Sequence, residues 1–295
     1  MLDKDLTAKI KRIQFYTSHL VSASFAGEYE SVFKGRGIQF EDVREYVPGD
    51  DVRDIDWNVT ARELKPYVKR FVEERENTVI LAVDVSASGE FGTNHRKKNE
   101  LAAEISAVLA FAATRNNDKV GLLMFSDRIE LFVPPRKGRK HVLRIIREIL
   151  SFSGEGVGTD ISSAVDYVGK IAKKRATVFL ISDFPLPSAE DSYIRPLSLL
   201  KRRHDVVGIC VQDRMEKRLP AAGLIDLQDL ETGKTITVDC SDKGLRRRFE
   251  EMSQRRNEEL QTELRGAKID FINVETGEPY INDFIKFFHM RRKRR

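Results

Sequence analysis

The stretch TVILAVDVSAS, residues 78–88, joins an uninterrupted apolar run to a short loop that carries a carboxylate and two hydroxyls. A short, continuous apolar run rich in branched residues is typical of a strand that is buried on both faces of a sheet. The loop begins with Asp84, and Ser86 and Ser88 follow at every second position. We expect these three side chains to lie close together where the strand ends.

Further apolar runs of the same kind follow, and helical patterns such as Leu101, Ile105, Val108 and Leu109 separate them. This alternation predicts an α/β fold with a doubly wound, mostly parallel sheet and helices on both faces. The third strand follows the second too closely for a crossover, so we expect it to be an antiparallel edge strand. The strands of the sheet are expected near residues 78–83, 120–125, 129–133, 177–181, 206–211 and 269–274. A separate hairpin is expected at 224–230 and 235–240, and a long charged helix at 242–265.

The composition of the 295-residue chain, with 41% hydrophobic and 33% charged residues, excludes a largely disordered protein. The net charge is +5, but basic and acidic residues are interspersed except in the run at 291–295. We interpret that run as solvated helix surface and expect no nucleic-acid binding. Cys210 and Cys240 lack metal or redox spacing, and neither a signal peptide nor an apolar stretch of about 20 residues is present. We therefore expect a cytoplasmic protein.

The N-terminal part differs from the rest of the chain. A helix with Leu6, Ile10 and Ile13 precedes a polar stretch that is punctuated by glycines. We expect residues 1–76 to be a small attached element that packs on the α/β domain of residues 77–295. Charges of both signs surround Trp57, the only tryptophan, and this pattern predicts an ion-paired anchor around one buried aromatic ring.

Four predicted strands end at or near an aspartate, namely Asp84, Asp127, Asp183 and Asp213. Any one of them is more often a helix cap or a turn residue than a ligand. Position in the sheet distinguishes two of them, because open α/β sheets bind ligands where the strand order reverses. For the order 3-2-1-4-5-6, the reversal lies between the strands that end in Asp84 and Asp183.

Carboxylate and hydroxyl oxygens at this reversal are the ligands that hard cations prefer. A glycine-rich loop at 154–160 adds a hydroxyl from Thr159. Taken alone, Thr159 or Asp160 is more often a helix cap, but the presence of the other four residues favours a ligand. We therefore predict a site for Mg²⁺, with Mn²⁺ or Ca²⁺ as alternatives. Its proposed ligands are Asp84, Ser86, Ser88, Thr159 and Asp183.

The three segments DVSAS at 84–88, GTD at 158–160 and LISDF at 180–184 resemble the metal-ion-dependent adhesion site of von Willebrand factor A domains. In that family, such residues surround Mg²⁺, and an acidic side chain of a protein partner completes the coordination. The resemblance therefore implies a partner with an exposed Asp or Glu. One departure is Phe184-Pro185, where many such domains have glycine after the third aspartate.

The N-terminal part contains Gly35-Arg-Gly37, Phe40, Arg44-Glu-Tyr46, Pro48-Gly-Asp-Asp51 and Ile55-Asp-Trp57. This set resembles the signature of the bacterial domain-of-unknown-function family number fifty-eight, whose members are often encoded beside MoxR-type AAA+ ATPases. The resemblance implies an adaptor or a maturation or chaperone partner of such an ATPase.

Other functions have less support. A P-loop, a G-x-S-x-G elbow and the second aspartate of haloacid dehalogenases are absent, and the five histidines show no metal-ligand spacing. We therefore expect a binding protein and not an enzyme. The alternatives left open are a Mg²⁺-dependent hydrolase that uses the same crevice and a nucleic-acid-binding protein. Membrane contact through the basic C-terminus is a further, less favoured reading.

Overall fold

The computed structural model describes residues 4–21, 23–33, 37–74, 76–93, 97–152, 156, 158–186, 192–228 and 233–294. The chain divides into a larger compact unit, Met1–Val32 with Thr78–Arg295, and a smaller one, Phe33–Asn77. This division differs from the boundary expected at residue 76, because the N-terminal helices belong to the larger unit. The ring of Phe25 there packs edge-on against that of Phe288, with centroids 5.5 Å apart. Packing of the smaller unit on the α/β domain stays a prediction.

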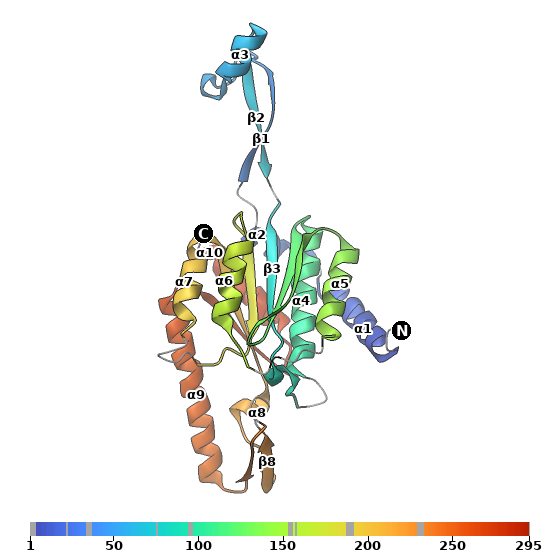
Figure 1. The fold of residues 1–295 in the computed structure, drawn as a ribbon, viewed down its shortest axis with the longest axis vertical. Coiled ribbons are helices and arrows are strands. Elements are labelled where there is room, and N and C mark those ends of the chain that lie inside the picture. The colour runs from blue at the N-terminus through green and yellow to red at the C-terminus, as the bar shows by residue number, and fades with distance from the viewer. Residues whose placement is uncertain are drawn as a thin grey trace. The chain divides into compact units, whose positions relative to one another are not determined.

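The larger unit is built on a six-stranded sheet with the order β10-β7-β6-β3-β4-β5 (Figure 1). All neighbouring strands are parallel except β4 and β5, which are antiparallel. The strands are β3 (Thr78–Asp84), β4 (Lys119–Phe125), β5 (Ile129–Arg136), β6 (Thr177–Ser182), β7 (Asp205–Gln212) and β10 (Asp270–Glu275). The predicted fold class, the antiparallel edge strand and the order 3-2-1-4-5-6 are thus confirmed.

Helices cover both faces of this sheet. On one face, Ile80 and Ala82 of β3 share a core with helices α6 (Ile161–Ile171), α7 (Ile194–Arg203) and α9 (Lys243–Gly266). The residues of β3 that alternate with these two point to the opposite face of the sheet. Helices α4 (Lys98–Arg115) and α5 (Arg139–Leu150) cover that face. Figure 1 shows α6 beside α7 and α4 beside α5. Apolar side chains are therefore buried on both faces of the sheet, as expected for strands that are apolar on both sides.

Further helices and a hairpin complete the larger unit. Helices α1 (Lys4–Leu20) and α2 (Ala23–Phe33) lie against α4 and α10 (Ile281–Lys293), respectively. Strands β8 (Leu224–Gln228) and β9 (Thr235–Asp239) form the expected antiparallel hairpin, whose predicted turn lies partly outside the described residues. Short helices η2 (Ala87–Glu90) and α8 (Arg214–Lys217) follow β3 and β7. No helix in the described ranges is both long and apolar enough to cross a bilayer.

The smaller unit is an antiparallel pair, β1 (Gly37–Glu45) and β2 (Tyr67–Glu74), with η1 (Val52–Asp54) and α3 (Trp57–Glu63) between the strands. The predicted ion pairing is present, since the guanidinium of Arg44 donates to both carboxylate oxygens of Asp50, at 2.8 and 2.6 Å. The predicted burial of Trp57 is wrong. Trp57 is the first residue of α3 and its side chain is 69% exposed.

Candidate metal centre

The candidate site lies where the strand order reverses. Strand β3 has β4 on one side and β6 on the other, and the crossovers that follow β3 and β6 proceed in opposite directions. Asp84 is the last residue of β3, and Asp183 directly follows β6. Because the two strands are parallel neighbours, their carboxyl ends bring both aspartates to the same edge of the sheet.

Asp84 is held by hydrogen bonds from two sides. Its side chain is buried, with 8% of the residue exposed. The Ser86 N–H donates to Oδ1 of Asp84 at 3.0 Å, and the Ser182 hydroxyl donates to Oδ2 at 2.6 Å. The hydroxyls of Ser86 and Ser88 are 3.1 Å apart. The loop thus gathers the three oxygen-bearing side chains that its spacing predicted.

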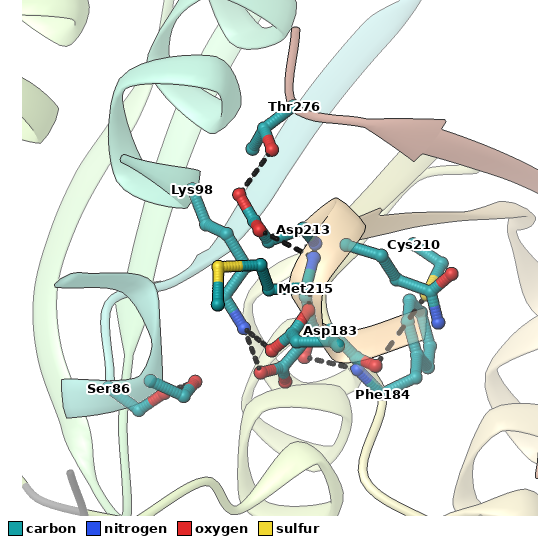
Figure 2. Close-up of polar contacts among 12 residues, drawn as sticks. Ser86, Lys98, Asp183, Phe184, Cys210, Asp213, Met215 and Thr276 are labelled. Carbon is teal, nitrogen blue, oxygen red and sulfur yellow. Dashed lines mark hydrogen bonds and ion pairs between the residues drawn. The ribbon is translucent and has the colours of Figure 1, made fainter. Parts of the chain in front are cut away.

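Asp183 is paired with a lysine that the sequence had not indicated. Figure 2 shows Lys98, the first residue of α4, extending to Asp183. Its second partner is Glu216 of α8. Its Nζ lies 2.9 Å from Oδ2 of Asp183 and 2.7 Å from Oε1 of Glu216. The side chain of Lys98 is 4% exposed, so this ion pair is largely shielded from water.

The two carboxylates of the site differ in their electrostatics. Burial, with the negative charge of Asp183 beside it, raises the pKa of Asp84 to about 6, although the hydrogen bonds from Ser182 and Ser86 oppose the shift. Burial also disfavours the charge of Asp183, but the Lys98 ammonium outweighs it and lowers the pKa of that carboxyl. Likewise, the carboxylates of Asp183 and Glu216 outweigh the burial of Lys98 and raise its pKa.

Four of the five predicted ligands line one cavity. Asp84, Ser86, Ser88 and Asp183 surround a volume of about 20 Å³, which is room for one water-sized group. The donor set fits a hard divalent cation, since it consists of carboxylate and hydroxyl oxygens. The ammonium of Lys98 contacts Asp183 and Glu216, and no bond from it to Asp84 or the serines is found among the described residues. The Asp84 side of the cavity is therefore compatible with a cation.

Thr159, the fifth predicted ligand, is half-buried and is not among the residues that line this cavity. The next residue, Asp160, donates its N–H to the carbonyl of Ser126 at 2.7 Å. The side chain of Asp160 accepts from the Ser163 N–H at 2.9 Å and caps α6. The loop is thus attached to the end of β4, next to β3, and a role for Thr159 as a ligand stays a prediction.

The loop after Asp183 departs from the glycine pattern in sequence but not in backbone conformation. Phe184 has a φ of +50°, in the left-handed region that glycine adopts without strain. Its ring is 1% exposed and packs edge-on against Phe271 and Tyr193, with centroids 5.4 and 6.2 Å away. Burial of the ring offsets the cost of the left-handed backbone. Asp183, the residue before it, lines the cavity.

Sequence reasoning missed three residues of the site, and one of them had a signal. Ser182 is a polar residue that directly follows four apolar ones in a fully buried strand, and its hydroxyl also accepts from the Phe184 N–H at 3.1 Å. Lys98 and Glu216 stand in highly charged segments, where no local pattern distinguishes them from surface residues. Their role depends on the approach of α4 and α8, which only the tertiary structure gives.

Comparison with known proteins finds relatives that are similar over nearly the whole chain. Uncharacterized proteins of Mycobacterium tuberculosis and Mycobacterium bovis are each 30% identical over 293 residues, which is 99% of this chain and 91% of theirs. Among solved structures, an aerotolerance-related membrane protein from Bacteroides fragilis is 16% identical and has a TM-score of 0.50. The match covers 74% of this chain and 100% of that one, and it supports the fold alone.

The family match covers most of the smaller unit and most of the sheet. The family described as "Protein of unknown function DUF58" matches residues 42–259. That range includes most of the signature segment and all the predicted ligands. By this match and by its curated relatives, the chain belongs to the DUF58 family.

Proposed function

We propose that this protein is a metal-dependent protein–protein interaction module. A divalent cation, in the first place Mg²⁺, would be held by Asp84, Ser86, Ser88 and Asp183, with Thr159 as a further donor. The observation that carries the proposal is the single cavity that these first four residues line at the reversal of the sheet. When bound, the cation would supply a Lewis-acidic positive charge at the mouth of this cavity.

The composition of the site favours capture of an acidic group from outside. Only two of the proposed ligands are carboxylates, and one of them, Asp183, already shares its charge with Lys98. Hydroxyl ligands leave the charge of a divalent cation only partly neutralised. A carboxylate from an Asp or Glu of a partner protein would complete the neutralisation, and the chain's own serines and aspartates would orient the cation toward it.

A binding role is favoured over catalysis by the residues around the cavity. Metal-assisted hydrolysis needs a general base within reach of the attacking water. Nε2 of His141 lies 2.9 Å from the carbonyl of Val120, and Nδ1 of His204 accepts from the Ala176 N–H, so both rings are engaged elsewhere. Among the described residues that line the cavity, the ionisable groups are the two proposed carboxylate ligands and the paired Lys98.

The basic C-terminus has internal partners, which argues against a nucleic-acid or membrane surface there. Arg291 is paired with Asp205 and Asp270, at 2.6 and 3.0 Å. Arg292 reaches Glu28 at 3.3 Å. We therefore propose a protein partner, and the family resemblance favours a MoxR-type AAA+ ATPase for which this chain acts as an adaptor or maturation partner. Free, buried cysteines at 210 and 240 are compatible with the cytoplasmic location that we propose.

Affinity capture of partners with the full chain tests this function. We expect a partner that is retained in Mg²⁺, is lost in EDTA, and is lost when Asp84→Asn removes one ligand charge. The control is Asp127→Asn, which changes another strand-end carboxylate that pairs with Arg128 and does not line the cavity. Partners that persist through both chelation and Asp84→Asn would exclude the metal from recognition.

Two further assays separate the proposal from its alternatives. Direct titration with Mn²⁺ should give a site that Asp84→Asn abolishes. Turnover of phosphoesters or peptides that disappears in Asp84→Asn would favour a hydrolase. Binding of DNA or RNA that weakens steeply with salt would favour a nucleic-acid-binding protein.

A further inference from the structure

Lys98 is the element of the cavity that the proposed function does not use. It is a buried, permanently charged group that lines the same cavity as the proposed ligands. It is also close to one of the two carboxylates on which a cation would depend, at 2.9 Å from Oδ2 of Asp183. A positive charge in this place has a direct electrostatic consequence for any cation that enters.

The second partner of Lys98 is fixed independently of the cavity. Oε2 of Glu216 accepts from the Asp213 N–H at 2.8 Å, which completes the capping box of α8. Asp213 is in turn held by Thr93 and by Thr276. Glu216 is therefore held by a hydrogen bond that does not involve Lys98.

We propose that Lys98 is a built-in competitor of the divalent cation. Its ammonium neutralises Asp183. On binding of a cation to the site, Lys98 would leave Asp183 and stay bound to Glu216. This inference rests on the proposed function and deepens it, because it assigns the residue that sets how much cation the site requires. Repulsion between the ammonium and the cation, and competition for one carboxylate, both weaken cation binding.

The alternative role for Lys98 has the opposite signature. If the lysine only positioned Asp183 for the metal, its removal would loosen the ligand and weaken cation binding. Competition predicts tighter binding after removal. Neutralisation of Glu216 leaves Asp183 as the carboxylate partner of Lys98 among the described residues and should make displacement of the ammonium harder.

Titration of the full chain with Mn²⁺, with free Mn²⁺ measured by electron paramagnetic resonance, tests the inference. We expect Lys98→Met to bind Mn²⁺ at least about tenfold more tightly than the unchanged chain, from the loss of one nearby charge. Glu216→Gln, which keeps an acceptor for the Asp213 N–H, should bind several-fold more weakly. The matched control is Lys97→Met, which removes a neighbouring positive charge that is 54% exposed and paired with Glu90. It should change the affinity by less than about twofold, because exposed charges are screened.

A second readout covers the stability of the variants. Lys98→Met leaves two carboxylates without their common partner, so its melting temperature in EDTA should fall, and Mn²⁺ should restore more of it than in the unchanged chain. If Lys98→Met does not fold, Lys98→Gln can be used in the same assays, because glutamine is uncharged but still donates hydrogen bonds.

The outcomes distinguish this inference from the proposed function. Absence of Mn²⁺ binding to the unchanged chain and to all variants would overturn both. Binding by the unchanged chain that weakens or stays the same in Lys98→Met would overturn the competitor alone. Binding by Lys98→Met but not by the unchanged chain would support the competitor and overturn the metal-dependent function.

Discussion

Replacement of Asp84 by asparagine should make the metal-free protein more stable at neutral pH. Burial raises the pKa of this carboxyl to about 6, whereas in the unfolded chain it is about 3.8. A group that binds its proton more tightly in the folded state stabilises the fold fully at low pH. That contribution is lost as the pH rises through 4 to 6, so at pH 7.5 the ionised Asp84 destabilises the fold.

The magnitude follows from the difference of about 2 between the two pKa values. At pH 7.5 this difference corresponds to about 3 kcal/mol of unfolding free energy, and at pH 4.5 to about 1 kcal/mol. Asparagine has one acceptor oxygen where aspartate has two, so one of the bonds from Ser86 or Ser182 is weakened, at a cost of about 1 kcal/mol. The net expectation for Asp84→Asn is a gain of about 2 kcal/mol at pH 7.5 and about none at pH 4.5.

Urea unfolding in EDTA, followed by circular dichroism at the two pH values, measures both quantities. The matched variant is Asp183→Asn, for which we expect the opposite sign. The pKa of Asp183 is lowered by Lys98, so its neutralisation removes a partner from a buried ammonium and should cost about 2 kcal/mol at pH 7.5. If Asp84→Asn is less stable than the unchanged chain at pH 7.5, or if its advantage does not shrink toward pH 4.5, the electrostatic account of the cavity is wrong.

Three further comparisons, which use five variants, test the fold by urea or thermal unfolding. Phe184→Gly should be about 1 kcal/mol more stable than Phe184→Ala. Both variants lose the buried ring, but only glycine adopts the left-handed backbone without strain. An alanine variant that is more stable than the glycine variant would show that the backbone at this position is not strained. Arg291→Met should cost about 3–5 kcal/mol through its buried pairs with two aspartates, whereas Arg292→Met should change stability by less than about 0.5 kcal/mol. Trp57→Ala should also change the free energy of unfolding by less than about 0.5 kcal/mol, because the side chain is exposed. A cost above about 3 kcal/mol would instead indicate that Trp57 is a buried residue, as the sequence had predicted.

The sheet could be predicted from the sequence because its signals are local. Strands β3, β4, β6 and β7 are continuous apolar runs, and a run buried on both faces has few alternatives to a parallel sheet with helices on each side. The short connection at 126–128 required the antiparallel edge strand β5. The order of the strands then placed Asp84 next to Asp183, which are 99 residues apart in the sequence.

The parts that the sequence did not predict depend on distant contacts. Lys98 belongs to a run of charged residues, and its burial follows from where α4 meets α8. Trp57 was expected to be buried because charges of both signs surround it in the sequence, but a two-stranded unit with one short helix has little interior in which a large ring could be buried. Phe184 adopts a backbone conformation typical of glycine because the packing of its ring against two neighbouring rings offsets the cost of the positive φ.

The sequence left open whether a strand-end aspartate is a cap or a ligand, and the electrostatics of two of them separate the roles. Asp213 is fully buried at the end of β7, and its oxygens accept from the Thr93 N–H and hydroxyl, the Met215 N–H and the Thr276 hydroxyl. Burial opposes its charge, but these bonds outweigh it and lower its pKa, so Asp213 strengthens the fold as an ionised cap.

Asp84 stands at the equivalent point of β3, yet its bonds from Ser86 and Ser182 do not offset its burial, and its pKa rises to about 6. An ionised Asp84 therefore weakens the fold at neutral pH, and a neutral amide of the same size would serve the structure better. Asp84 is thus a buried carboxylate that lowers the stability of the fold, lines a cavity and has hydroxyl oxygens beside it. This arrangement is typical of a functional site and supports the role that we propose for Asp84 as a cation ligand. For Asp183, the Lys98 ammonium outweighs burial and lowers the pKa of the carboxyl, which is compatible with the role that we propose for it as the second carboxylate ligand.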